Sequence, residues 1–189
     1  MGLFTGAWQE MKGLPEPMHR PLKLPTKPRR ERAESKALWN DARSSQHADF
    51  FTFGYEGRST PELLRVLQSA GVRSVLDIRH TPISMYRPEL SKSNFQRLLE
   101  EEGFQYLHSP EWGVPKDIRV KAIAAGRREP IWEWYDSYVV DRFFANNLHW
   151  FLNLEHPVAM MCVEADPTEC HRHRLFLAFE RLGLRGFDL

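Results

Sequence analysis

Residues 161–172 read Met161-Cys162-Val163-Glu164-Ala165-Asp166-Pro167-Thr168-Glu169-Cys170-His171-Arg172, and they mark a junction between a strand and a helix. The apolar run at residues 157–163 has strand length and enough apolar residues to be buried on both faces, as strands of a parallel sheet are. Asp166, Pro167 and Glu169 match the capping pattern of a helix N-terminus, so we expect a helix to start at Asp166. Reactive side chains therefore gather where this strand ends.

Three side chains at the junction are candidate catalytic groups. Cys170 would lie in the first helical turn, where free N–H groups and partial positive charge attract anions and favour a thiolate, so it is either a reactive or a structural thiol. His171 shares a helical face with apolar residues, which makes it either a core histidine or a general acid or base. Glu164 is either a proton acceptor or the partner of Arg172 in an internal ion pair.

Strands and helices alternate through the rest of the chain. We expect strands at residues 49–54, 72–78, 104–107 and 157–163, and a last edge strand from residue 186. Helices are expected from Ser59, from Ser91 or Ser93, and over much of 131–153, with a long loop at 109–130. This alternation predicts an α/β fold: a mostly parallel sheet of about four or five strands with helices on both faces, a Rossmann-like three-layer sandwich.

Charged residues follow the predicted strands at their carboxyl ends, the edge where parallel sheets bind ligands. Asp77 is either a general base or a turn cap paired with a neighbouring arginine. The remaining candidates are ligand-binding side chains, since arginines clamp phosphate or carboxylate groups. They are Glu56, Arg58, Arg79, Arg87 and Arg172.

Four motifs resemble those of one protein family. They are Phe53-Gly54-Tyr55-Glu56-Gly57-Arg58, then Val75-Leu-Asp77-Ile-Arg79-x2-Pro82-x-Ser84, then Tyr106-x5-Trp112-Gly113, and last Cys162-x-Glu164-x5-Cys170-His171-Arg172. In this order they resemble the domain of unknown function 488 family over about residues 50–189. The resemblance implies the family's fold and motifs, and it brings no established reaction with it.

Residues 1–48 differ from the remainder and are expected to be a proline-rich basic extension to a single domain at 49–189. Between His19 and Ala33 six arginine and lysine residues stand against one glutamate. Such a segment is typical of a solvated tail or of an arm that contacts phosphates. Two cysteines make no disulfide framework, and no run approaches the length of a membrane span, so we expect a cytoplasmic protein without membrane association.

The leading functional hypothesis is an enzyme, or a degenerate enzyme, that binds an anionic ligand such as a nucleotide or nucleic-acid end. One alternative is a non-catalytic nucleotide- or nucleic-acid-binding module, and another is a thiol-redox or zinc-stabilised structural protein. The spacing of Cys162, Cys170 and His171 differs from that of zinc fingers, so no metal is predicted. The sequence names neither a cofactor nor an oligomeric state.

Overall fold

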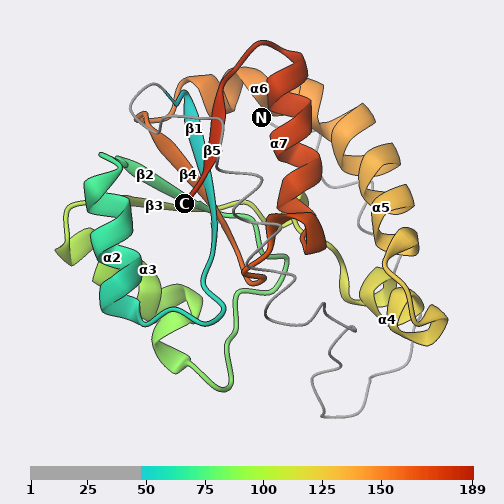
Figure 1. The fold of residues 1–189 in the computed structure, drawn as a ribbon, viewed down its shortest axis with the longest axis horizontal. Helices are drawn as coiled ribbons and strands as arrows, with labels where there is room; N and C mark the ends of the chain where they lie inside the picture. Colours follow the sequence, from blue (N-terminus) through green and yellow to red (C-terminus); the bar gives the residue numbers. More distant parts are fainter. Residues whose placement is uncertain (1–47) are drawn as a thin grey trace, which may run out of the picture.

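Five parallel strands form the sheet at the centre of this protein, in the computed structural model that describes residues 48–189 (Figure 1). The strands lie in the order β3-β2-β4-β1-β5, and every pairing between neighbours is parallel. Their bounds are β1 Phe50–Gly54, β2 Ser74–Asp77, β3 Gln105–His108, β4 Val158–Cys162 and β5 Gly186–Asp188. The predicted parallel α/β sheet is confirmed, including the short edge strand near the end of the chain.

Helices cover both faces of the sheet and complete a three-layer sandwich (Figure 1). One face packs against α2 (Thr60–Ser69) and α3 (Lys92–Glu101). The other packs against α4 (Lys116–Ala125), α5 (Glu129–Tyr135), the π-helical η5 (Asp136–Phe144), α6 (Ala145–Leu152) and α7 (Arg172–Arg181). Three short 3-10 turns, η3 (Pro88–Leu90), η4 (Pro110–Trp112) and η6 (Pro167–Glu169), lie in the connections.

The alternation of side chains along β4 sets the direction of the first signature cysteine. Ala159 and Met161 pack in the cluster beneath α2 and α3, whereas Met160 and Cys162 pack in the cluster beneath α4 to α7. Successive residues of a strand point to opposite faces, so this division follows from the position of each residue in β4. Cys162 therefore faces α7, the helix that follows the second signature cysteine.

The predicted start of α2 is confirmed in detail. The Ser59 hydroxyl accepts a hydrogen bond from the Glu62 amide, and the Glu62 carboxylate accepts one from the Ser59 amide at 2.7 Å. This reciprocal pair is a capping box, which satisfies two amides that the first helical turn leaves without partners. The local sequence alone determines where this helix begins.

The prediction of a long loop at residues 109–130 was wrong, because α4 lies within it. Ile118 and Ala122, one helical turn apart, are the buried residues of this helix, and most of its other side chains are exposed. Gly126 ends it in the left-handed conformation, with φ 65°. An apolar stripe this narrow gives little periodic signal among charged neighbours, so the helix depends on the tertiary contact.

The expected helix start at Asp166 was also wrong. Asp166 does accept a hydrogen bond from the Thr168 amide, but the turn it caps is only the three-residue η6. Cys170 follows in an extended conformation, with φ −122°, and α7 begins at Arg172. Cys170 thus lies between two helical segments and not in the first turn of one.

Two further findings bear on the remaining predictions. Within residues 48–189 no helix has both the length and the apolar character that a membrane span requires. The predicted extension at residues 1–48 falls almost entirely outside the described residues.

Candidate functional site

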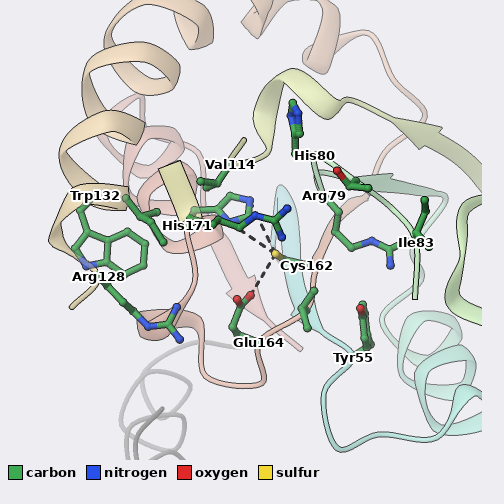
Figure 2. Close-up of a pocket in the computed structure, with 14 residues that line it drawn as sticks. Tyr55, Arg79, His80, Ile83, Val114, Arg128, Trp132, Cys162, Glu164 and His171 are labelled. Atoms are coloured by element: carbon green, nitrogen blue, oxygen red, sulfur yellow. Dashed lines mark hydrogen bonds between the residues drawn. The ribbon is translucent and has the colours of Figure 1, made fainter. Parts of the chain in front are cut away.

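A pocket of about 150 Å³ opens at the carboxyl edge of the sheet, above the ends of β1, β2 and β4 (Figure 2). Three of the predicted site residues line it: Arg79, Glu164 and His171. Its other lining residues are Tyr55, His80, Thr81, Ile83, Val114, Arg119, Arg128, Ile131, Trp132, Cys162 and Val163. The pocket thus lies at the edge where the strand ends meet, and Glu56, Arg58, Asp77, Arg87, Cys170 and Arg172 are not among its lining residues.

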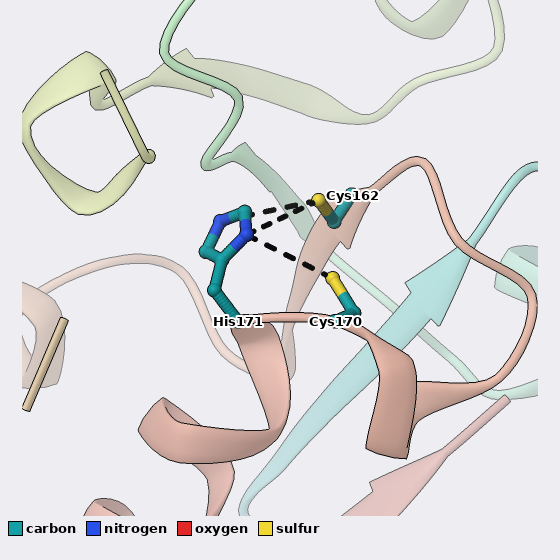
Figure 3. Close-up of side chains that lie close together, drawn as sticks. All are labelled: Cys162, Cys170 and His171. Atoms are coloured by element: carbon teal, nitrogen blue, oxygen red, sulfur yellow. Dashed lines mark hydrogen bonds between the residues drawn. The ribbon is translucent and has the colours of Figure 1, made fainter. Parts of the chain in front are cut away.

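The two cysteines and the histidine form a compact cluster on the sheet side of this pocket (Figure 3). The Nδ1 atom of His171 lies 3.8 Å from the Cys162 sulfur and 3.9 Å from the Cys170 sulfur. Both thiols are free, and both are almost fully buried. The Glu164 carboxylate lies 3.4 Å from the Cys162 sulfur, which completes a group of four reactive side chains.

Burial and mutual charge set the protonation of this group. Burial raises the pKa of Glu164 to about 7, with the neighbouring Cys170 as a second cause. Burial also raises the pKa of Cys162, because the thiol is the form that low dielectric favours. Burial would raise the pKa of Cys170 too, but hydrogen bonding from Cys162 and the charges of His171 and Arg172 lower it well below its ordinary value.

The ring of His171 is held by its surroundings. Tyr135 packs against it with ring centroids 5.0 Å apart, and the Tyr135 hydroxyl donates to the Trp112 carbonyl. Burial would lower the pKa of His171, but the charges of Cys170 and Glu164 and a hydrogen bond with the Ile78 carbonyl raise it. The imidazole is therefore a fixed and readily protonated group between the sulfurs.

Asp77 lies beneath the pocket and not in its wall. Its carboxylate accepts from the Arg79 guanidinium at 2.9 and 2.6 Å and from the Tyr106 hydroxyl at 2.7 Å. Asp77 is fully buried, and Arg79 also donates to the Leu90 carbonyl. Burial would lower the pKa of Arg79, but the Asp77 carboxylate raises it overall, so the arginine stays charged. The geometry matches the ion-paired turn, which was one of the two expectations for Asp77.

Arg58 and Arg87 bind backbone carbonyls next to the pocket. Arg58 donates to the Leu189 carbonyl at 2.8 Å, and burial lowers its pKa. Arg87 donates to the Arg58 carbonyl at 2.7 Å and to the Thr60 hydroxyl at 3.0 Å. These contacts tie the loops after β1 and β2 together, and neither arginine is among the residues that line the pocket.

Arg172 and Glu56 position the loop that carries Glu164. Arg172 donates to the carbonyls of Glu164 and Ala165, while Glu56 accepts from the Ala165 amide at 3.2 Å. An ion pair between Arg172 and the Glu164 side chain was one of the two expectations for Glu164, but among the described residues the guanidinium pairs with Asp188 at 3.3 Å. Arg172 is fully buried, so it supports the site from behind.

Two arginines of the pocket were missed by sequence reasoning. Arg119 is an exposed residue of α4, and Arg128 lies just before α5 with its Nε atom 2.9 Å from the Glu169 carboxylate. Both fall in the segment expected to be a long loop, so α4 and the start of α5 were not recognised there. The pattern Arg127-Arg128 beside an aromatic segment was the only available signal.

The fold and site define an α/β protein with thiol, imidazole and carboxylate groups at the carboxyl edge of a parallel sheet. The chain belongs to the family described as Domain of unknown function DUF488, whose model matches residues 59–177, more than half of its length. The match confirms the resemblance that the sequence motifs indicate. Comparison with curated proteins gives no significant match, and neither does comparison with solved structures.

Proposed function

We propose that this protein is an enzyme that binds a ligand carrying an anionic group, a nucleotide or a nucleic-acid end, in the pocket at the carboxyl edge of the sheet. The observation that carries the proposal is the make-up of the pocket wall. Arg79, Arg119 and Arg128 line the same space as Cys162, Glu164 and His171. Cations for binding and reactive groups for chemistry are thus gathered around one opening (Figure 2).

The arginines would bind the anionic part of the ligand. Arg79 lines the pocket and stays charged, because burial would lower its pKa but the Asp77 carboxylate raises it overall. Its guanidinium already donates to Asp77 and to the Leu90 carbonyl, so it would attract an anion by its positive charge. Arg119 and Arg128 would add charge from the opposite wall, since guanidinium groups hold phosphate and carboxylate oxygens well.

The thiol, imidazole and carboxylate groups of the pocket would carry out the chemistry. Glu164 would act as proton acceptor, and His171 or Cys170 would be the second reactive group, because all three lie around the Cys162 sulfur. Asp77, Glu56, Arg58, Arg87 and Arg172 would act by positioning the loops that carry these groups. We also propose a cytoplasmic location, in which both free thiols stay reduced.

Two other functions use the same residues. A non-catalytic nucleic-acid-binding module would combine the pocket arginines with the basic extension, which lies outside the described residues. Its binding would weaken steeply with salt and survive Glu164→Gln and Cys170→Ser. A thiol-redox protein would oxidise Cys162 and Cys170 to a disulfide and pass the two electrons and two protons to an oxidised partner; the two sulfurs lie within 4.8 Å of each other.

A thermal-shift screen with nucleotides and short phosphorylated oligonucleotides tests the proposal. A ligand at about 100 times its Kd stabilises the folded state by about 2.7 kcal/mol, which raises the Tm by roughly 5–10 °C in a protein of this size. Arg119→Gln should abolish that shift without lowering the Tm of the free protein, because Arg119 is exposed. Arg97→Gln on the exposed side of α3 is the matched control. An equal shift in both variants would contradict the proposal.

A further inference from the structure

We propose that Cys162, Cys170 and His171 bind a divalent metal ion of the zinc class. Their three donor atoms all lie within 4.8 Å of one another, and all three residues are buried (Figure 3). The inference goes beyond the proposed function, because a metal can bind here whether or not an anionic ligand enters the pocket.

The distances fit one ion. In a tetrahedral zinc site, sulfur and nitrogen ligands are about 2.3 and 2.0–2.1 Å from the metal, which places them about 3.6 Å from each other. The Nδ1 atom of His171 lies 3.8 Å from one sulfur and 3.9 Å from the other. The three donor atoms lie within 4.8 Å of one another, and both ring nitrogens of His171 are almost equally far from the Cys162 sulfur. An ion between the three donors therefore requires shifts of up to about 1 Å and a rotation of the imidazole that directs one nitrogen at the metal.

The chemistry of the donors selects the class of metal. Thiolate and imidazole are the ligands that zinc and similar borderline-soft ions prefer, whereas magnesium and calcium prefer oxygen. The sequence spacing hides this set because Cys162 ends β4 and Cys170 follows the short turn η6. That turn brings the second cysteine back to the first, which no finger-type spacing describes.

The fourth coordination position would open to the pocket. Cys162 and His171 line the pocket, whereas Cys170 is not among its lining residues, so the open side of the cluster faces the cavity. A site with three protein ligands and one open position is the arrangement of catalytic zinc, which holds water or substrate there. Glu164 stands beside this position, with its carboxylate 3.4 Å from the Cys162 sulfur.

Glu164 does not belong to the group of three donor atoms that lie within 4.8 Å of one another, so we assign it a different role from the three metal ligands. Zinc enzymes that activate water for attack on a nucleobase divide the work in this way: one histidine and two cysteines bind the metal, and a separate glutamate handles protons. We assign Glu164 the second role, in which it would take the proton that a metal-bound water loses. The division predicts different metal affinities for variants of Glu164 and of the donors.

Metal binding is tested on the full chain, purified under reducing conditions and then stripped with a chelator. Co²⁺ added to the stripped protein should give thiolate charge-transfer and tetrahedral ligand-field bands, and Zn²⁺ should displace them. Zn²⁺ should also protect both cysteines of the unaltered protein from an alkylating agent, a measurement that requires no variant to fold. Absence of the Co²⁺ bands, or equal alkylation with and without Zn²⁺, would overturn the proposal.

Variants then assign the ligands. Cys170→Ser and His171→Ala should each weaken Zn²⁺ binding more than about 100-fold. The loss of a residue that only hydrogen-bonds to a metal ligand has a smaller effect. Glu164→Gln should keep Zn²⁺ affinity within about 10-fold. The exposed His149 on α6 provides the matched control, His149→Ala, with unchanged affinity. Equal affinities in His171→Ala and His149→Ala would refute the assignment.

The same samples separate this inference from the proposed function. If Zn²⁺ binds but no nucleotide or oligonucleotide stabilises the protein, the result supports the metal site and contradicts the proposed anionic ligand. If such a ligand stabilises the stripped protein and no Co²⁺ bands appear, the result supports the anionic ligand and contradicts the metal site. A disulfide between the cysteines that forms despite Zn²⁺ would favour the thiol-redox function and overturn the metal site.

Discussion

Arg172 and Asp188 form an ion pair in which both side chains are completely buried, with Nε 3.3 Å from the carboxylate. The pair joins the first turn of α7 to the edge strand β5, and the Thr52 hydroxyl of β1 donates to the same carboxylate at 2.7 Å. Because Arg172 also binds the carbonyls of the loop that carries Glu164, this pair connects the stability of the sheet to the geometry of the site.

We expect Arg172→Met to destabilise the protein by about 3–5 kcal/mol, because it removes the guanidinium that balances the buried charge of Asp188. Urea unfolding monitored by circular dichroism measures the change. The exposed pair of Arg185 and Asp49 offers the control, and Arg185→Gln should cost less than about 1 kcal/mol. Similar losses in the two variants would show that burial does not set the strength of the Arg172 pair.

A second prediction concerns the close approach of β1 to the loop after β4. A Cβ atom at Gly54 would lie 1.7 Å from the Glu164 carbonyl oxygen, so Gly54→Ala must displace that loop. We expect a loss of both stability and metal or ligand binding. Gly103→Ala, at φ 83° with open space around it, should cost only about 1–2 kcal/mol of backbone strain and leave binding intact. Unchanged binding in Gly54→Ala would contradict the prediction.

Tyr106 gives a prediction about alkaline pH. Burial and the Asp77 carboxylate raise the pKa of Tyr106 above its ordinary value of 10, because both disfavour the phenolate. In the unfolded chain Tyr106 loses its proton first, so its stabilising contribution is complete below about pH 10 and is lost as the pH rises further.

Tyr106→Phe should cost about 1–3 kcal/mol near neutral pH, since Asp77 loses a hydrogen bond in a buried setting. The variant should then lose less stability than the unaltered protein between about pH 9 and pH 11. Denaturant unfolding across this range tests both effects. Parallel stability curves for the two proteins would show that the hydroxyl of Tyr106 does not titrate with folding.

We further predict that residues 1–47 are dispensable for folding, because their prolines and charges suit a solvated extension. A chain that begins at Ala48 should keep a cooperative unfolding transition at nearly the same urea concentration as the full chain. A large shift to lower urea would show instead that apolar residues such as Trp8 complete the core. The comparison also tests the predicted division between extension and domain.

The sequence predicts most elements of the fold because their signals are local. The run at 157–163 is apolar enough to be a buried strand, and Ser59 with Glu62 determines a helix start. Helix α4 was missed because only Ile118 and Ala122 are its buried residues, so its stability comes from tertiary contacts, chiefly with α5. Its absence from the prediction removed Arg119 from the candidate site.

Only some of the residues predicted for the site line the pocket at the carboxyl edge of the sheet. Parallel strands bring their carboxyl ends together, so Glu164, His171 and Arg79 were expected there and line the pocket. Arg58 and Arg172 share that edge but bind backbone carbonyls, and no local pattern tells a ligand-binding arginine from one that ties loops together. Cys162 and Cys170 flank one tight connection, so the sequence predicts that they lie close together, and their sulfurs lie within 4.8 Å of each other.

The order of the strands has a consequence for how the protein is made. β4 lies between β1 and β2, yet it leaves the ribosome long after both of them. Until residues 158–162 emerge, the aromatic strand Phe50–Gly54 has no neighbour on that side, and the nascent chain exposes an apolar edge. Exposed strand edges promote aggregation during synthesis. The central position of a late strand therefore leaves both β1 and β2 with an unpaired edge until most of the chain has been synthesised.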